Sequence, residues 1–422
     1  MRWKPDGIWL NANYRILWSA VTVSSFGSKI TDLAIPLLAA IALHASPFEI
    51  AVLAAAQNLA TPVFGLFAGV VADHRARRPL LIVSDAARAV LLIAIPIAWW
   101  LDELSVPLLI LVSFISGSFR ILFDLARQSI VPNLVTREQL VDGNGKLYTS
   151  EAAADLTGPG LAGILVQLIG APAAVLLDCV SYAVSALFLA RMTVVERIDR
   201  RPLGIRNVLS GLPDGARVLR EQHMLRWIGL SVAVGNLFES ASAAMLVLFM
   251  TRRLDLSAAE IGIIFACGGL GFFVGSIVAT RFAARLGLGR AINAGLLIFL
   301  LGDLLYPVAG GPPLMIVALL SLAQFLGGIG GGVFDINQFS LRQVLIPDEV
   351  RGRVNALLRV MIRGIMPVGA LLGGVIAEAV DLRAVFVFAC LSSPISIWFM
   401  YRAGVPRLNS MSEAPVPQTL SA

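Results

Sequence analysis

Long apolar runs recur along almost the whole chain, and they constrain its fold more than any other feature. Charged residues make up 14% of the 422 residues, whereas about 25% is usual in a soluble domain. Each run is long enough for a helix to cross the hydrocarbon core of a bilayer. Inside lipid every backbone polar group must be satisfied within the protein, which leaves helices or closed barrels. Because the runs do not alternate apolar and polar residues as barrel strands do, an all-α integral membrane protein is predicted.

Twelve transmembrane helices can be drawn through these runs, in two six-helix halves. The stretch between the sixth and seventh runs is long and rich in arginine, so it is expected to be a linker. The predicted spans are 16–42, 49–72, 79–100, 106–126, 146–170, 172–191, 226–250, 259–283, 289–309, 313–336, 356–380 and 383–402. The predicted parts are an N-terminal half at 1–191, a cytoplasmic linker at 192–225, a C-terminal half at 226–407 and a disordered tail at 408–422.

An internal repeat supports the division into two related halves. The pattern Gly-x-x-x-Gly occurs in the second span at 65–69 and again in the eighth span at 271–275. The stretch RQSIVPNLV at 127–135 is similar to RQVLIPDEV at 342–350. Many transporter folds are built from repeats of this kind, with their substrate sites near the middle of the membrane.

Arginine and lysine gather in alternate loops between the spans. Arg75, Arg77 and Arg78 follow the second span, and the linker carries six more arginines. The opposite loops are short and poor in arginine apart from Arg252 and Arg253. Loops rich in Arg and Lys stay in the cytoplasm, so both termini are predicted to be cytoplasmic. This topology accounts for the net charge of +6 without a nucleic-acid partner.

The loop after the second span carries a recognisable motif. The stretch GLFAGVVADHRARRPLL at 65–81 resembles the signature of the major facilitator superfamily, G-x-x-x-D-R-x-G-R-R/K. The chain departs from the pattern at His74, where the signature has Arg, and at Ala76, where it has Gly. The resemblance implies the twelve-helix major facilitator fold, in which the two halves rock about a central site.

The same resemblance implies a set of gating residues. They are Gly69, Asp73, Arg77, Arg78 and Asp124. In the family the matching Asp caps a helix of the opposite half, which a carboxylate does favourably because of the helix dipole. The resemblance further implies that Arg77 pairs with Asp124 of the fourth span. Such contacts would hold the outward-facing state.

The fifth span contains a helix-packing motif. Gly158, Pro159 and Gly163 belong to GPGLAG, which resembles the antiporter motif of the superfamily with Ala162 in place of one glycine. Small residues allow helix backbones to approach closely, and a proline kinks a helix. The motif favours export over import.

Acids inside the spans are candidates for proton coupling. A charge at membrane depth is costly and usually faces a cavity or a partner. Burial favours the protonated form of a carboxylate, whereas a nearby cation favours the charged form. Asp32 lies three residues from Lys29, and Glu239 has no charged residue near it in sequence. The candidates are Asp32, Glu239, Glu151, Asp155 and Asp178, of which Glu151 and Asp155 are expected to share a proton; Asp303 and Asp335 are further acids within spans.

Four residues are predicted to contact substrate. Lys29 and Arg120 are cations inside the first and fourth spans, and Phe26 and Phe238 are aromatic residues of the first and seventh. Arg120 resembles, in position, the fourth-span arginine of superfamily antiporters. The phenylalanines would supply the apolar wall of a cavity.

Three stretches suggest a branch within the superfamily. SKITDLAIPLL at 28–38, ADHRARRPLLIVSDAARA at 72–89, and RQSIVPNLV followed by GPGLAG resemble the branch that contains the enterobactin exporter and the macrolide efflux proteins. The resemblance implies a secondary active transporter of the bacterial inner membrane that couples proton entry to efflux of a drug or of a secreted metabolite such as a siderophore. Proton-coupled uptake of an organic solute and a non-transporting membrane sensor are the alternatives.

Several other function classes are not expected. The chain has no GxxxxGK[ST] motif for ATP, and no nucleophile–base or metal constellation, so it is not expected to be an enzyme or to bind a metal. The three histidines are scattered near span ends, at His44, His74 and His223. The expected energy source is a proton gradient without a cofactor. The expected partners are a small-molecule substrate and the lipid bilayer, and a monomer is the family expectation.

Overall fold

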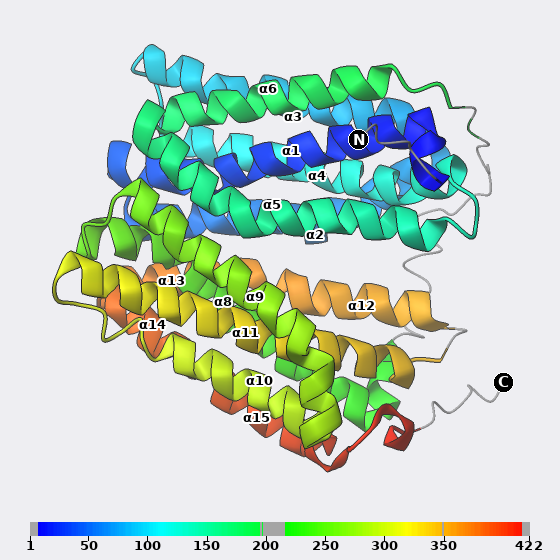
Figure 1. Ribbon diagram of the computed structural model, residues 1–422. Coiled ribbons are helices and arrows are strands. Elements are labelled where there is room, and N and C mark those ends of the chain that lie inside the picture. Colours follow the sequence, from blue (N-terminus) through cyan, green and yellow to red (C-terminus); the bar gives the residue numbers. More distant parts are fainter. Residues whose placement is uncertain (1–6, 195, 197–215, 348–349, 416–422) are drawn as a thin grey trace, which may run out of the picture. The chain divides into compact units, whose positions relative to one another are not determined.

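Helices make up the fold. The computed structural model describes residues 7–194, 196, 216–347 and 350–415, and within these the chain forms no strand (Figure 1). The contacts divide the chain into two compact units. The N-terminal unit comprises Met1–Ala45, Ala56–Ile205 and Ser257–Gly262, and the C-terminal unit comprises Ser46–Ala55, Arg206–Leu256 and Ile263–Ala422.

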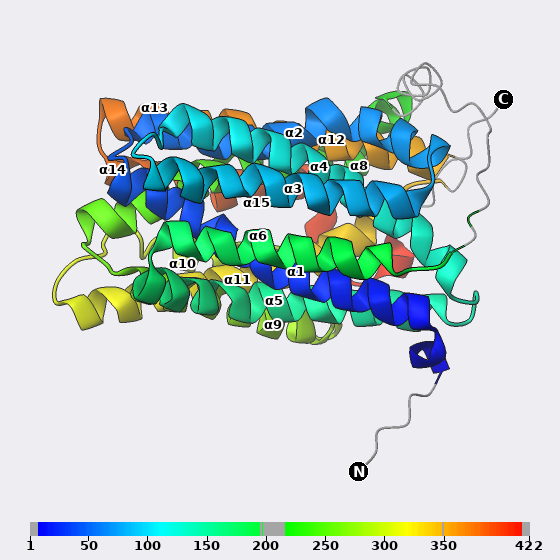
Figure 2. The ribbon, with the colours of Figure 1, turned by 90° about the horizontal axis from the view of Figure 1, so that it is seen from above.

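The first half of the sequence forms six long helices after a short 3-10 turn at Gly7–Leu10. They are α1 (Ala12–Leu37), α2 (Pro47–His74), α3 (Arg77–Trp100), α4 (Val106–Leu134), α5 (Leu140–Ile169) and α6 (Ala171–Ala190). Helix α6 lies against α1 and α3, α1 also packs on α5, and α3 packs on α4 (Figure 2). This packing brings together the charged residues that α1, α3, α4 and α5 carry within their apolar sequences.

In the described part of the second half, eight helices follow Gln222, because two of the predicted spans are interrupted. The helices are α8 (His223–Leu248), α9 (Ala258–Leu286), α10 (Leu288–Asp303), α11 (Pro313–Leu345), α12 (Arg351–Gly364), α13 (Met366–Ala379), α14 (Leu382–Ala389) and α15 (Ser392–Ala403). Pro367 and Pro394 lie in the first turns of α13 and α15. A proline fits the first turn of a helix but breaks a continuing one, which explains both interruptions.

Eleven helical segments in the described part of the chain are long and apolar enough to cross a membrane. They correspond to eleven of the twelve predicted spans. The remaining span, predicted at 289–309, is represented by α10, which has 16 residues and is followed by turns from Leu304 to Val308. Helix α10 is therefore shorter than the sequence led us to expect, and it ends at the acidic residue Asp303.

The two halves repeat one structural detail that the sequence comparison did not reveal. Helices α1 and α8 each continue into a π-helical turn, and a capping box then starts the next helix. The π turns are Leu38–Ala42 and Phe249–Arg253. The Glu49 carboxylate accepts a hydrogen bond from the Ser46 N–H at 2.7 Å, and Glu260 accepts one from the Ser257 N–H at 2.8 Å. Capping boxes satisfy N–H groups that a helix start leaves without partners.

The predicted disordered tail is ordered at its beginning. After a 3-10 turn at Val405–Arg407, the carbonyls of Leu408 and Asn409 accept hydrogen bonds from the N–H groups of Gly289 and Leu288, at 2.9 and 3.0 Å. These N–H groups belong to the first turn of α10, which has no intrahelical acceptors for them. A further 3-10 turn follows at Met411–Glu413. The expectation of disorder from residue 408 is thus wrong for 408–415, and 416–422 lie outside the described residues, as does most of the predicted linker.

Candidate functional site

The N-terminal unit contains a polar cavity of about 220 Å³. It lies between α1, α3, α4 and α5, within helices that are otherwise apolar. Its charged lining residues are Lys29, Arg88, Arg120, Asp124, Arg127, Glu151 and Asp155. Cations and acids are therefore present in nearly equal numbers. Charges at this depth need partners or water to offset the cost of leaving the aqueous phase.

Lys29 is the centre of an ion-pair network in this cavity. Its Nζ lies 2.7 Å from Asp155 Oδ1 on α5 and 3.6 Å from Asp32 Oδ2 one turn along α1. Arg120 of α4 lies 3.9 Å from the same oxygen of Asp32. Asp32 therefore lies between two cations, at distances longer than a tight ion pair, and its side chain is 48% exposed. The predicted cavity residues Lys29 and Arg120 do line the cavity.

The acids of α5 do not pair with each other. Glu151 lies 3.1 Å from Arg127, whereas Asp155 lies 2.7 Å from Lys29. A separate cation therefore reaches each carboxylate, and the sharing of a proton by Glu151 and Asp155 stays a prediction. Spacing along one helix could not show this, since the two cations come from α4 and α1.

The predicted pair between Arg77 and Asp124 is also absent from the described part of the chain. The carboxylate that reaches Arg77 belongs to Glu196, which follows α6 and is 5% exposed. Its two oxygens accept hydrogen bonds from the backbone N–H groups of Arg77 and Arg78, at 2.6 and 2.8 Å. The guanidinium of Arg77 lies 3.9 Å away. Asp124 instead lines the polar cavity.

Two other members of the signature loop can be placed. The Arg78 guanidinium donates hydrogen bonds to the carbonyls of Leu189 and Ala190, at 3.3 and 2.6 Å, and so binds the last turn of α6. A side chain at Gly69 would meet no atom within 4 Å. Asp73 ends α2, and its side chain lies outside the described part. The gating roles of these residues stay predictions.

A buried polar network in the same unit was missed by the sequence analysis. Asp85 on α3 is fully buried, lies 3.9 Å from Arg88 and accepts a hydrogen bond from Ser185 on α6. Arg88 stacks on the ring of Tyr182, whose hydroxyl lies 2.6 Å from Ser28 Oγ on α1. An acid and an arginine three residues apart in an apolar run were the available signal.

Asp178 is the one proton-coupling candidate of the N-terminal unit that lies away from the cavity and its ion-pair network. It is fully buried on α6 and accepts a hydrogen bond from Ser181 at 2.9 Å. A Cβ at Gly27 of α1 would come within 2.4 Å of its carboxylate, so α1 and α6 touch here. The adjacent Phe26 is not among the residues lining the polar cavity, and its predicted contact with substrate stays a prediction.

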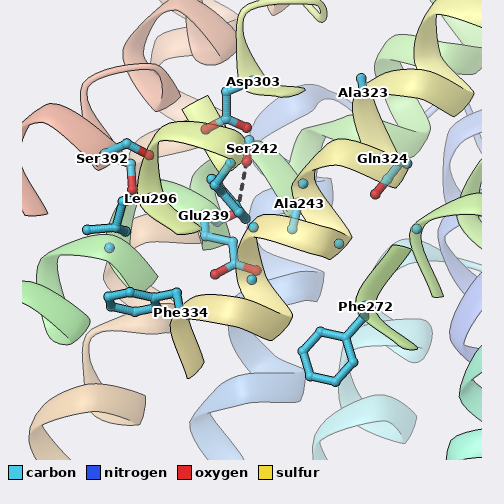
Figure 3. A pocket seen from close by; sticks show the side chains of 18 of the residues that line it. Glu239, Ser242, Ala243, Phe272, Leu296, Asp303, Ala323, Gln324, Phe334 and Ser392 are labelled. Atoms are coloured by element: carbon cyan, nitrogen blue, oxygen red, sulfur yellow. Dashed lines mark hydrogen bonds between the residues drawn. The ribbon is translucent and has the colours of Figure 1, made fainter. Parts of the chain in front are cut away.

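The C-terminal unit contains a larger cavity, of about 460 Å³. Glu239 of α8, Asp303 of α10 and Asp335 of α11 line it, and no lysine or arginine is among its lining residues (Figure 3). Phe265, Phe272, Phe299, Phe334, Tyr306 and Phe386 supply aromatic surface. Phe238 is buried against Phe388 and is not among the residues lining this cavity, so its contact with substrate stays a prediction.

Glycines of α11 bring this helix close to its neighbours beside the cavity. A Cβ at Gly328 would lie 2.3 Å from the Gly268 carbonyl of α9, and one at Gly330 would lie 2.5 Å from the Gly295 carbonyl of α10. The backbone of α11 therefore contacts two neighbouring helices directly. Gly328, Gly330 and Gly332 pack helices closely, as small residues do in membrane proteins.

The helix-packing motif of α5 has the expected function at two positions. A Cβ at Gly158 would lie 2.6 Å from the Cβ of Lys29, so Gly158 makes space for the Lys29 side chain. A Cβ at Gly163 would lie 2.4 Å from the Ala258 carbonyl, in the first residues of α9, which belong to the same unit. The carbonyl of Pro159 faces Gly262 there.

Comparison with known proteins gives the family. The chain belongs to the transmembrane secretion effector family, whose model matches residues 9–420, within the major facilitator superfamily. It is 26% identical over 413 residues to the multidrug efflux pump Tap of Mycolicibacterium fortuitum, covering 95% of this chain and 97% of Tap. It is 24% identical over 370 residues to the enterobactin exporter EntS of Escherichia coli O127:H6, covering 86% and 84%.

Solved structures support the same fold. A bacterial homologue of the iron transporter ferroportin, in its inward-facing state, aligns with a TM-score of 0.70 at 16% identity, over 93% of this chain and 98% of that one. An identity this low shows the fold alone. The predicted major facilitator fold with twelve helices is confirmed, and so is the expectation of a membrane transporter of small molecules rather than an enzyme.

Proposed function

We propose that this transporter exports an amphipathic small molecule in exchange for protons, by alternating access of its two halves. The observation that carries the proposal is the position of Asp32 between Lys29 and Arg120, two cations that line the cavity of the N-terminal unit. An acid that carries a proton must be stable in both its charged and its protonated form. Asp32 has two loosely placed cations as partners and a side chain that is 48% exposed, so protons can reach it.

Protonation of Asp32 would change the whole network. The neutral acid no longer attracts Lys29, which keeps Asp155 at 2.7 Å, or Arg120. The cavity then gains one unit of positive charge, and its cations must find other partners. Such a change at one residue is a local electrostatic event that can bias a two-state transporter. Glu239 in the other unit is the second candidate for the coupling acid.

Export is favoured over uptake by two observations. The α5 motif at Gly158 and Gly163 resembles that of antiporters, and its glycines make the close contacts that the motif requires. The relatives named above are an efflux pump and an exporter. We further propose a monomer in the bacterial inner membrane, with both termini in the cytoplasm and no cofactor.

Transport in everted membrane vesicles tests the proposal. A respiration-driven proton gradient should drive accumulation of at least one member of a panel containing a lipophilic cation, a macrolide and a catecholate siderophore, and a protonophore should abolish it. Accumulation only in right-side-out vesicles would establish uptake instead. A C-terminal fluorescent-protein fusion that fails to fluoresce in the cytoplasm would contradict the topology.

A further inference from the structure

We propose that the cavity of the C-terminal unit binds the positive group of an amphipathic organic cation, such as an aromatic amine or a quaternary onium ion. Glu239 and Asp303 would recognise the charge, and the aromatic lining would hold the apolar body. This inference names the substrate class of the proposed exporter and rests on that function. It assigns substrate recognition to the C-terminal unit and proton coupling to the N-terminal one.

The two cavities differ in the charges of their lining residues. The cavity of the N-terminal unit is lined by four cationic and three acidic side chains. The cavity of the C-terminal unit is lined by three acids and by no lysine or arginine. An anion entering it would meet only like charges, and such a juxtaposition is unfavourable. A cation would offset the cost of keeping carboxylates within the membrane.

Buried polar groups line this cavity. Asp303 and Tyr306 are each 8% exposed and Ser393 is fully buried, and all three line the cavity. Within the described chain, the Ser393 hydroxyl has no hydrogen-bond partner. Nearly all buried polar groups in proteins have hydrogen-bond partners. Their arrangement around one space indicates a ligand with a cationic group and hydrogen-bond donors or bound water.

The aromatic lining fits the same class of ligand. Tyr306 stacks on Phe386 with ring centroids 5.3 Å apart, and Phe386 contacts Phe249 at 4.7 Å. Figure 3 shows Phe272 and Phe334 beside the cavity that Glu239 and Asp303 line. Aromatic faces attract cations, most strongly where water is excluded. A cavity of about 460 Å³ is in the range of pockets that hold drug-sized ligands.

A metal ion is a poorer fit. Among the described residues, no group of three or more His, Cys, Asp or Glu side chains is placed to hold a metal ion. Glu239, Asp303 and Asp335 line the cavity from three different helices without forming such a group in the described chain. A bulky organic cation can meet such dispersed carboxylates, whereas a metal ion needs them in one shell.

A pair of ions with the same shape and opposite charge tests the inference. Radiolabelled tetraphenylphosphonium and tetraphenylborate would be bound to the purified full-length protein in nanodiscs at fixed pH and corrected for binding to empty nanodiscs. The wild type should bind the cation and not the anion. Glu239→Gln and Asp303→Asn should each weaken binding of the cation at least tenfold, whereas Glu239→Asp should restore most of it. Glu378→Gln, which removes an exposed acid of α13 outside the cavity, should bind as the wild type does.

Specific outcomes would overturn the inference. They are equal binding of both ions by the wild type, binding of neither ion, or unchanged binding of the cation by both cavity variants. The wild-type comparison does not depend on whether a variant folds. If the catecholate or macrolide is exported with protons while the cation is neither bound nor transported, the proposed function stands and the inference fails. If the cation binds but nothing in the panel moves with protons, the inference stands and the proposed function fails.

Discussion

At the scale of single residues, Gly158 shows how a small side chain determines the position of a charge. Lys29 crosses from α1 to Asp155 of α5, and its Cβ and Cγ occupy the space that a side chain at Gly158 would need. A glycine in a helix costs stability relative to alanine, by about 1 kcal/mol. Its presence here is explained by the ion pair that it permits rather than by the helix.

Gly158→Leu should therefore destabilise the protein, although leucine is the better helix former. Overpacking of this kind costs about 1–3 kcal/mol. The melting temperature in detergent should fall, and proton-coupled transport should be lost because Lys29 is displaced. Gly145→Leu is the matched control on the same helix, since a Cβ there meets no atom within 4 Å. A Gly158→Leu protein as stable as the control would contradict the close contact between Gly158 and the Lys29 side chain.

The sequence identified several of the site's charges but not their partners. Asp32, Lys29 and Glu239 could be predicted because a charge within an apolar run is conspicuous. Asp303 was noted as an acid within a span, but its place in the same cavity as Glu239 depends on how α8, α10 and α11 surround that cavity, which no local pattern encodes. Phe26 and Phe238 do not line the two cavities, and the sequence could not place them because an aromatic residue packs equally well in a core and in a cavity wall.

At the scale of helices, the start of α3 is stabilised from a distant part of the chain. The residue before the helix is Ala76, which has no side chain that could cap it. Glu196 supplies the carboxylate instead, and Arg78 in turn binds the end of α6. Since Glu196 lies at the beginning of the predicted linker, these bonds fix the chain leaving α6 to the signature loop.

Glu196→Gln should weaken this connection without removing the side chain. The amide has one acceptor oxygen in place of two and no charge for the helix dipole, so a loss of about 1–2 kcal/mol is expected. Hydrogen exchange at the amides of residues 77 and 78 should become faster. Glu138→Gln, at an exposed acid between α4 and α5, should leave the exchange of these two amides unchanged. Equal protection in the two variants would show that Glu196 is not the cap.

The helices themselves were largely predictable, and their ends were not. The runs of apolar residues predicted the membrane spans, because length and composition decide whether a helix can cross a bilayer. The breaks before α13 and α15 occur next to prolines that were visible in the sequence, but a proline inside an apolar run can kink a helix or end it. The order of residues 408–415 depends on free N–H groups at the start of α10, which the sequence does not display.

At the scale of the whole molecule, the two halves share an architecture and differ in charge. Both have the π turn and capping box between their first two helices. One encloses a balanced network of cations and acids, and the other encloses acids and aromatic rings. A repeat with diverged cavities suits an exporter in which one half binds protons and the other binds a cation.

Proton movement in proteoliposomes tests this account most directly. Tetraphenylphosphonium would be added to acid-loaded vesicles that contain the wild type, Asp32→Asn or the control Glu378→Gln, and the internal pH would be followed against protein-free vesicles. The account predicts that internal pH rises for the wild type and the control. It predicts no rise for Asp32→Asn, whose affinity for the cation should stay within about twofold of the wild type. A rise at the wild-type rate in Asp32→Asn would contradict the assignment of proton coupling to the N-terminal unit.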